Sequence, residues 1–375
     1  MKEMKVRPIE IARYYEEEKY TIIEKFNQIM EKGNFILGEE VENFEKEFAQ
    51  YCNAKYCVSV GNGLDAITVL LMALGVGPND EIIVPSNTFI ATWLAVTRLG
   101  AVPIPVDADE ENFNIDPDLI EAKITPKTKG VIGVDLYGLP FKAALVKEIC
   151  DKHNIFLIDD AAQSHGAMIG NKRVGAHVLA SAFSFYPVKN LGAFGDGGAV
   201  ITDELELANR IRIIRNYGSS KKYIHKELGI NSRLDELQAG FLRISLTKLD
   251  KWLETRRRIV NEYSGAFSSL DIMVPREGKS ERSSWHLYVI RLKQRDALMN
   301  YLTKKGVQTI IHYPIPPHLQ SAYKHLNYKK GDFPITEMLC NEVLSLPLHP
   351  YMKKEEVEYV IDQVINFETE RKLIH

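Results

Sequence analysis

The chain has 375 residues, of which 45% are hydrophobic and 26% are charged, and its formal net charge is −3. That length predicts a large domain with a smaller one, and the composition is ordinary for a globular enzyme. The small net charge indicates no binding to nucleic acid or to a membrane surface. No apolar run approaches the roughly 18 residues of a membrane helix, and the N-terminus lacks a signal-peptide core. The cysteines have no metal-ligand spacing, so we expect reduced thiols, no metal site and a cytoplasmic protein.

Strand-like and helical segments alternate along the first two-thirds of the chain. Short apolar runs predict strands at 57–60, 81–84, 102–106, 130–136, 155–159, 180–184 and 198–202. Helices are expected between most of them, including 116–123 and 143–153. This alternation predicts an α/β fold in which helices cover both faces of a mostly parallel sheet.

The turn Gly61-Asn62-Gly63 follows the first strand and precedes apolar residues at helical spacing. Glycines at such a turn let backbone N–H groups approach an anion, and a helix N-terminus favours negative charge. The turn therefore indicates a phosphate site. Its spacing is neither a Walker loop nor a dinucleotide fingerprint, and it could serve only to reverse the chain.

Asp159 and Asp160 follow the apolar run 155–158. Open α/β sheets bind ligands at the carboxyl ends of their strands. A carboxylate there could hold a pyridine nitrogen protonated and so make the ring an electron sink. Alternatively, one of the two caps the next helix.

Lys189 lies between the strand at 180–184 and the glycine-rich turn at 195–198. A buried ammonium is costly unless paired or neutralised, and a neutral lysine amine can bond covalently to pyridoxal 5'-phosphate (PLP). Taken alone, Lys189 is more simply a surface lysine in a hairpin loop. The phosphate turn and the aspartate pair favour the PLP interpretation.

A helical pattern runs from Arg233 to about residue 267, which would span roughly 50 Å at 1.5 Å per residue. The polar segment 227–238 at its start could be a simple helix N-terminus capped by Asn or Ser. Further elements are predicted as strands at 285–292 and 308–312 and helices at 295–305, 336–344 and 354–368. We expect a large domain over 1–240 and a smaller α+β domain over 241–375, joined by the long helix.

In their order and spacing, these segments resemble the DegT/DnrJ/EryC1/StrS family of PLP-dependent sugar aminotransferases. The likeness covers nearly the whole chain and includes the segments 33–38, 61–66, 85–92, 159–166, 183–198, 216–218, 229–238 and 311–318. Each motif is moderately specific, and their collinear combination is highly specific. The resemblance implies PLP fold type I, aspartate aminotransferase-like, with a mostly parallel seven-stranded sheet.

The resemblance also implies roles for matching positions. Lys189 would form the Schiff base and relay the substrate proton, and Asp160 would pair with the pyridinium nitrogen. Further cofactor contacts are expected from Gln163 at the phenolic oxygen, Phe89 on the ring face, and Ser184, Gly63, Leu64, Asp65 and Asn231 at the phosphate. Since relatives supply the residue matching Asn231 from the neighbouring subunit, a homodimer with shared active sites is implied.

Substrate contacts implied by the resemblance are Tyr186, Arg215, Tyr217, Lys222, Tyr313 and His318. Arg and Lys suit a pyrophosphate, whereas Tyr and His suit sugar hydroxyls. Tyr313 and His318 lie among prolines, in a loop that could instead be structural. His165 is expected to support the cofactor ring and not to act as an acid or base.

The segment 61–66 resembles the branch that aminates 3-keto sugars, and so do 85–96 and 312–316, whereas Leu139, Phe141 and Lys142 depart from the usual residues. The expected enzyme is a dTDP-3-keto-6-deoxyhexose 3-aminotransferase that uses glutamate. The main alternative aminates a nucleotide-linked 4-keto-6-deoxyhexose at C4. A sugar dehydratase of this fold would carry histidine in place of Lys189, and a PLP-binding regulator would need a basic surface or DNA-binding appendage that the sequence does not show.

Overall fold

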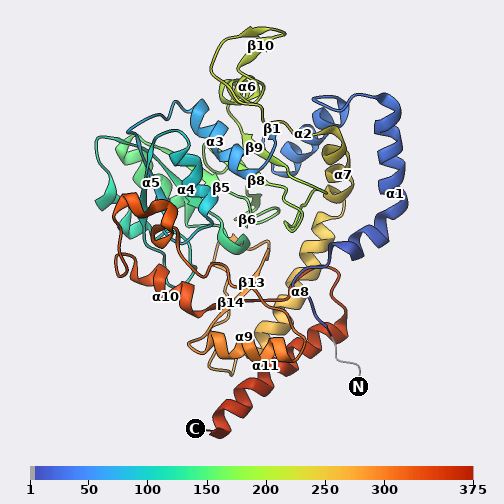
Figure 1. Ribbon diagram of the computed structural model, residues 1–375, viewed down its shortest axis with the longest axis vertical. Helices are drawn as coiled ribbons and strands as arrows, with labels where there is room; N and C mark the ends of the chain where they lie inside the picture. Colours follow the sequence, from blue (N-terminus) through green and yellow to red (C-terminus); the bar gives the residue numbers. More distant parts are fainter. Residues whose placement is uncertain (1–4, 375) are drawn as a thin grey trace.

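The computed structural model describes residues 5–374. Its central sheet has seven strands in the order β1-β9-β8-β5-β4-β2-β3 and lies in the upper half of Figure 1. Neighbouring strands are parallel except around β9, which runs antiparallel to both β1 and β8. The strands are β1 (Tyr56–Val60), β2 (Glu81–Pro85), β3 (Val102–Val106), β4 (Thr128–Val134), β5 (Phe156–Asp160), β8 (Ala180–Ser184) and β9 (Gly198–Thr202). The predicted α/β fold with a mostly parallel sheet is confirmed.

Helices cover both faces of this sheet. The helices α3 (Gly63–Ala73), α4 (Ile90–Thr97) and α6 (Leu205–Ile214) pack on one face, and α2 (Glu39–Tyr51) and α5 (Ala143–His153) pack on the other. Successive strand residues point to opposite faces. In β5, Ile158 therefore joins the core beside α3 and α4, while Leu157 joins the core beside α5. By the same alternation, Asp160 shares the face of Ile158, and Asp159 shares the face of Leu157.

A second core lies below the sheet in Figure 1, around the antiparallel strand pair β13 (Tyr288–Arg291) and β14 (Val343–Leu346). The helices that pack there are α8 (Leu249–Phe267), α9 (Arg295–Lys304) and α11 (Lys354–Ile374). This part is α+β, as expected. The chain crosses between the cores more than once, because Val6 belongs to the second core and Tyr323 packs against Trp93 of the first.

Some C-terminal predictions were wrong. The single long helix is two helices, α7 (Glu236–Leu246) and α8, interrupted at Thr247 and Lys248. The hydroxyl of Thr247 donates to the carbonyl of Ile244 at 2.8 Å, a local bond of the kind that competes with helix continuation. The predicted strand at 308–312 is only an isolated bridge between Ile310 and Ser345.

Other boundaries also differ. The predicted helix at 116–123 is a pair of 3₁₀ turns, η1 (Pro117–Leu119) and η2 (Glu121–Lys123). The predicted helix at 336–344 is α10 (Pro334–Glu342), which stops because the next residues pair with β13 as β14.

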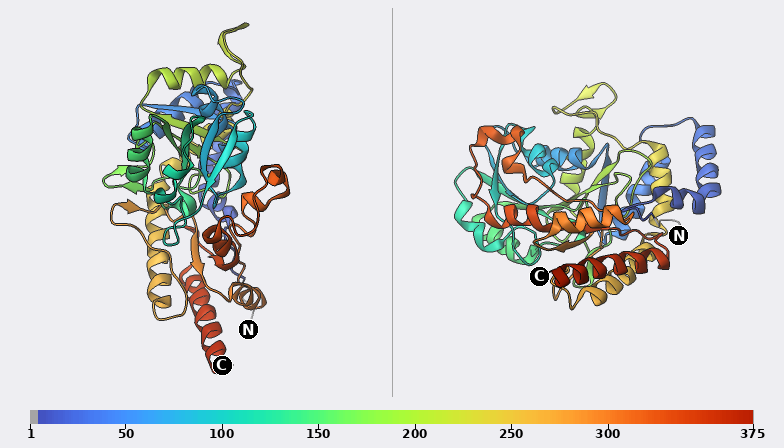
Figure 2. Two further views of the ribbon diagram at one scale, coloured as in Figure 1. Left: turned by 90° about the vertical axis from the view of Figure 1, so that its left-hand side faces the viewer. Right: turned by 60° about the horizontal axis from the view of Figure 1, so that its bottom comes forward.

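Smaller elements are β6 (Met168–Ile169), β7 (Lys172–Arg173), β12 (Glu281–Arg282), and the hairpin of β10 (Ser219–Lys221) and β11 (Ile224–His225). The hairpin projects from the body of the molecule (Figure 2).

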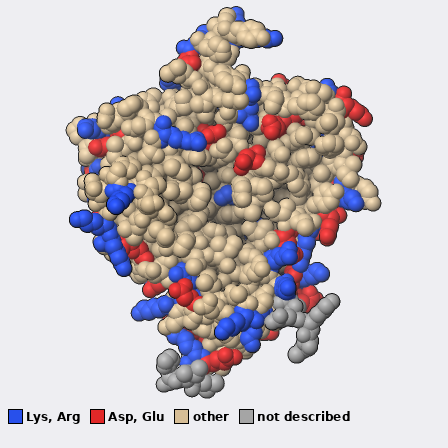
Figure 3. Space-filling view, viewed as in Figure 1, with Lys and Arg blue, Asp and Glu red and all other residues tan. Residues whose placement is uncertain are grey.

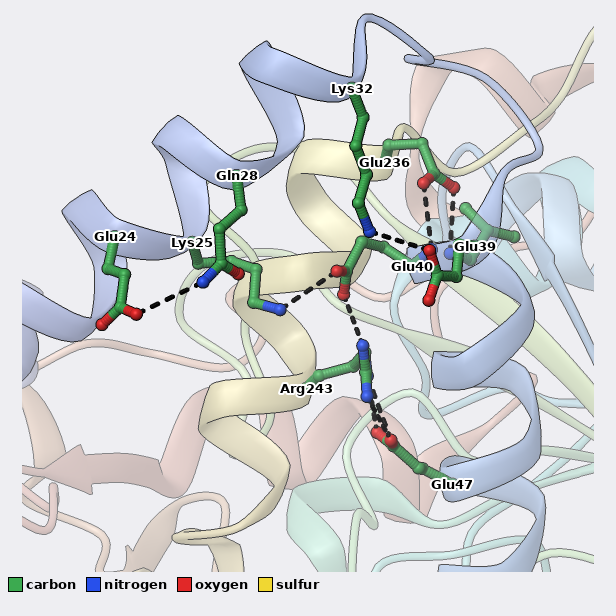
Figure 4. A network of polar contacts seen from close by, with 10 residues as sticks. Glu24, Lys25, Gln28, Lys32, Glu39, Glu40, Glu47, Glu236 and Arg243 are labelled. Atoms are coloured by element: carbon green, nitrogen blue, oxygen red, sulfur yellow. Dashed lines mark hydrogen bonds and ion pairs between the residues drawn. The ribbon is translucent and has the colours of Figure 1, made fainter.

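Helix α1 (Ile11–Lys32) forms an outer arm that ion pairs connect to α2 and α7 (Figure 4). Lys25 lies 3.0 Å from Glu40, and Arg243 lies 2.6 Å from Glu40 and 2.7 Å from Glu47. The Glu236 carboxylate accepts three backbone N–H groups at the start of α2, where the helix dipole favours negative charge. No helix within residues 5–374 has both the length and the apolar character needed to cross a bilayer.

Candidate active site

The candidate site lies at the carboxyl edge of the central sheet. Several strands end there, so the residues that end or follow β1, β2, β5 and β8 meet at one edge. These residues include Gly63, Phe89, Asp160 and Lys189. The face of the molecule drawn in Figure 3 is hollowed near its centre.

Lys189 and Asp160 form the charged centre of this site. Burial lowers the pKa of Lys189 to about 8, an effect that the nearby Asp160 carboxylate partly opposes. Asp160 accepts a hydrogen bond of 2.8 Å from the hydroxyl of Thr92 and one of 3.3 Å from the amide of Ala162. Burial raises the pKa of Asp160, while those two hydrogen bonds and Lys189 act in the opposite direction. A fraction of Lys189 is therefore a neutral amine near neutral pH, as a nucleophile requires.

Asp159 faces the opposite side of the sheet. The hydroxyl of Ser181 lies 3.3 Å from its carboxylate, and His177 Nε2 lies 3.5 Å from it. Burial, followed by the charge of nearby Asp135, raises the pKa of Asp159 well above its usual value. Of the two aspartates, Asp160 is therefore the one beside the lysine.

The start of α3 forms an anion site. A Cβ atom on Gly63 would lie 2.6 Å from Ser184 Cβ, so this close approach requires glycine. The amides of Gly63 and Leu64 belong to the first helical turn and have no partner within the helix. The amide of Asp65, which was also predicted to bind phosphate, instead donates to the Asn62 side chain at 2.8 Å. The geometry thus favours Gly63, Leu64 and Ser184 for the phosphate, because Asn62 caps the helix through the amide of Asp65.

An aromatic pair borders the site. Phe89 is 52% exposed, and its ring centroid lies 5.4 Å from that of Tyr313. Gln163 donates from Nε2 to the Tyr313 hydroxyl at 3.2 Å and accepts the amide of Tyr137 at 2.6 Å. The fold thus brings together three of the predicted residues, Phe89, Gln163 and Tyr313.

The sequence analysis did not identify two histidines near Lys189. Burial, reinforced by the charge of Lys189, lowers the pKa of His286 well below its usual value and that of His312 to about 4. His286 Nδ1 lies 3.4 Å from the side-chain oxygen of Asn190, and His312 Nδ1 lies 2.8 Å from the hydroxyl of Ser345. Nothing around His286 in the sequence indicated this position, whereas Asn190 adjoins the lysine and His312 lies in a family segment.

Two predicted substrate residues lie inside the fold. Arg215 is 6% exposed, lies 2.5 Å from Glu45 and donates to the Ser59 carbonyl at 2.6 Å. His318 is 2% exposed, with Nε2 3.1 Å from Glu337. Both side chains thus have internal partners, and their predicted substrate contacts stay a prediction. His165, also fully buried, packs among phenylalanines without a hydrogen bond within the described residues.

The remaining predicted residues are exposed. Tyr186 is 53% exposed beside the Lys189 loop. Tyr217 packs against the Arg233 guanidinium at 5.5 Å, and Lys222 lies on the projecting β10–β11 hairpin. Asn231 is exposed next to Ser232, whose hydroxyl donates to Asp65 at 2.7 Å. The segment that carries Tyr217, Lys222 and Asn231 is thus anchored at the phosphate turn of its own chain.

These residues fit the parts of PLP. The buried carboxylate of Asp160 suits its pyridine nitrogen, the lysine amine suits its aldehyde, Phe89 suits its ring face, and the start of α3 suits its phosphate. Together with the sheet and the α+β second core, the site defines a PLP-dependent aminotransferase of fold type I. The chain belongs to the DegT/DnrJ/EryC1/StrS aminotransferase family, whose family model matches residues 16–365.

Curated relatives and solved structures agree with this assignment. The chain is 47% identical over 359 residues to the erythromycin biosynthesis sensory transduction protein EryC1 of Saccharopolyspora erythraea, covering 96% of the chain and 98% of the relative. It is 47% identical over 343 residues to the dTDP-3-amino-3,6-dideoxy-alpha-D-galactopyranose transaminase of Aneurinibacillus thermoaerophilus, covering 92% and 94%. The crystal structure of DesV from S. venezuelae superimposes with a TM-score of 0.96 at 42% identity, covering 97% of this chain and 98% of DesV.

Other similar solved structures contain PLP or its amino form. The chain is therefore a PLP-dependent sugar-nucleotide aminotransferase, and its cofactor is PLP.

Proposed function

We propose that the protein transfers an amino group from glutamate to C3 of a dTDP-3-keto-6-deoxyhexose and forms the dTDP-3-amino-3,6-dideoxyhexose. The observation that carries amino transfer is the half-buried Lys189, whose pKa is lowered, near the buried carboxylate of Asp160. The choice of C3 is supported by the segment 61–66 and by the 3-amino sugar in the name of the A. thermoaerophilus relative. Amination of a 4-keto sugar at C4 is the alternative.

Each residue of the site has a distinct task in this reaction. PLP, when bound, supplies an electron-poor ring that accepts the electron pair left when a substrate C–H bond breaks. Lys189 takes up and returns that proton, a role its lowered pKa suits. Asp160 keeps a proton on the ring nitrogen, while Gly63 and Ser184 hold the phosphate.

A sensory or regulatory role is a second candidate, because the name of the S. erythraea relative describes sensory transduction. The presence of both Lys189 and Asp160, with the lysine pKa lowered toward neutrality, favours catalysis. Turnover of a nucleotide sugar by the purified protein decides between the two.

We infer a homodimer in which both chains contribute to each active site. Exposed apolar side chains gather on α1 and just beyond it, at Tyr20, Ile23, Phe26, Met30 and Phe35. Large exposed apolar surfaces mark interfaces, and we expect the dimer to bury more than about 2,000 Å². In a two-fold dimer every contact occurs twice. In this dimer the exposed segment bearing Asn231 meets the partner near the phosphate turn, so that each chain completes the other's site. Lys222 on the same segment then reaches the pyrophosphate of the nucleotide sugar.

Mixing two inactive variants tests the shared site. Lys189→Ala chains and Asn231→Ala chains should regain activity together, because one site of each hybrid dimer carries neither substitution. Random exchange should yield at most about a quarter of wild-type activity, since half of the dimers are hybrids with one intact site of two. The measurement is the rate of amino transfer after subunit exchange.

Mixing Lys189→Ala with Asp160→Asn is the matched control and should give no rescue, because both residues belong to the same chain's half-site. A monomer at working concentration, or no rescue despite proven exchange, contradicts the shared site.

Product analysis tests the reacting carbon. With glutamate and PLP, we expect amination at C3 of a dTDP-3-keto-6-deoxyhexose and little reaction with the 4-keto isomer, as measured by NMR of the products. The nucleotide anchor determines which sugar carbon arrives beside Lys189. A shift to C4 would leave hydroxyl partners such as Tyr313 unpaired, at roughly 1–3 kcal/mol each. An amine found only at C4 would establish the alternative and leave the aminotransferase assignment intact.

A further inference from the structure

A cavity lies beside the Lys189 loop, where α1, this loop, α8 and the segment after β14 meet. Its walls include Tyr14, Lys189, Trp252, Arg256, His349 and Tyr351. Its volume is about 60 Å³, several times the roughly 10–15 Å³ that one water needs. The cavity can therefore hold more than a single water.

Arg256 brings a buried positive charge to this cavity. Arg256 is 4% exposed. Its Nη1 donates to the carbonyls of Trp285, His286 and Leu348 at 3.0 to 3.2 Å. Its Nε is buried without a hydrogen-bond partner, and Arg256 forms no ion pair within residues 5–374. Burial lowers the pKa of Arg256 to about 10, which still leaves it charged at neutral pH. A buried charge without a counterion is costly, so the cavity favours an anion.

Two further polar atoms beside the cavity lack partners among the described residues. His349 is 3% exposed and its Nδ1 is unpaired, and the hydroxyl of Tyr351 is buried and unpaired. Buried polar groups are normally hydrogen-bonded, so three unpaired atoms around one cavity indicate an occupant that supplies the missing partners. Glu10 also lines the cavity, but it forms an ion pair with Arg13.

The other walls of the cavity are aromatic. The ring of Trp252 lies 5.3 Å from that of Tyr14 and 6.0 Å from that of Tyr351. These rings give the cavity apolar contact surface beside the Arg256 charge. A small ligand with an anionic end and an aliphatic stem matches these surroundings, because a carboxylate can accept from Arg256 while the stem contacts the rings.

We propose that this cavity binds a carboxylate group of the amino donor, with Arg256, His349 and Tyr351 as the groups that recognise it. The assignment rests on the proposed reaction, in which an amino acid would bring its amine to the cofactor carbon that Lys189 binds, and Lys189 forms part of the cavity wall. The carboxylate neutralises Arg256 and pairs with atoms that otherwise have no partner. The donor is thus recognised on the side of Lys189 formed by α1 and α8, separately from the exposed segment that carries Lys222.

Glutarate is the probe, because it has the carboxylates of glutamate but no amine and so cannot react. Its binding to the full-length PLP-loaded protein is measured by calorimetry. Loss of a charge-assisted hydrogen bond should raise the Kd of glutarate by roughly tenfold or more in Arg256→Lys and in His349→Phe. Arg257→Gln is the matched control, because the neighbouring Arg257 pairs with Glu277 at 2.8 Å and should leave the Kd unchanged. Binding of dTDP should be unchanged in all three variants.

A kinetic comparison gives an independent readout. The KM for glutamate should rise in both cavity variants, while the KM for the nucleotide sugar stays at its wild-type value. The proposal is overturned if glutarate does not bind the wild-type protein, which would leave the cavity to water, or if it binds the two cavity variants as tightly as the wild type. The binding test needs no turnover, so a C4 product would overturn the proposed regiochemistry alone.

Discussion

Replacing Lys189 with alanine should abolish amino transfer and leave the fold intact. The variant loses both the amine that bonds to PLP and the group that relays the substrate proton, and proton relay alone contributes about 10²- to 10⁴-fold. We expect kcat/KM to fall by roughly 10⁴-fold or more, which corresponds to at least ~5.5 kcal/mol of transition-state stabilisation. The variant should also lose the yellow colour of PLP bound to the lysine, and borohydride should no longer fix the cofactor to the chain.

Lys189→Arg is a matched control for charge, because arginine retains a cation but cannot form the covalent bond. It should be as inactive as Lys189→Ala. Circular dichroism and gel filtration should show wild-type structure in both variants. Peptide mapping of the reduced wild-type protein should place the cofactor on Lys189, and full turnover by Lys189→Ala would contradict the assignment.

Asp160→Asn should remove most of the activity and retain the fold. The amide can still accept from Thr92, but it has no negative charge to hold the ring nitrogen protonated. Removal of one such electrostatic partner typically costs about 10²- to 10³-fold in kcat. We expect a loss of this size, measured in steady state with saturating PLP, together with a shifted absorption band of the bound cofactor.

Asp159→Asn is the matched control for Asp160→Asn. It makes the same carboxyl-to-amide change at the adjacent residue of β5, but on the face that carries Ser181 and His177, away from Lys189. We expect kcat/KM near the wild-type value. The opposite result, an active Asp160→Asn and an inactive Asp159→Asn, would show that Asp159 is the partner of the ring nitrogen.

Much of the fold could be predicted because its signals are local. The strands β3, β8 and β9 and the helix α5 begin and end where the apolar runs and helical spacing indicated. The interruption at Thr247 and the end of α10 at Glu342 could not be predicted, because each depends on contacts outside the segment. The residues after Glu342 extend to pair with β13, which lies about 50 residues earlier, and their own sequence suits a helix equally well. The division at residue 240 stays a prediction.

The candidate site divides in the same way. The sequence by itself indicated Gly63, the pair Asp159 and Asp160, and Lys189 as candidates, because each lies in a short segment where residue types and spacing already limit the chemistry. Only the tertiary structure decided that Asp160 and not Asp159 faces the lysine, since the face of a strand residue depends on which helices cover each side. The tertiary structure also decided whether the charges of Arg215 and Arg256 are paired, because the two arginines look alike in the sequence. Arg215 meets Glu45 across 170 positions, whereas Arg256 meets three carbonyls and, among the residues that the structure describes, no carboxylate. Whether a buried charge is paired depends on neighbours that only folding brings together, and no local pattern records them.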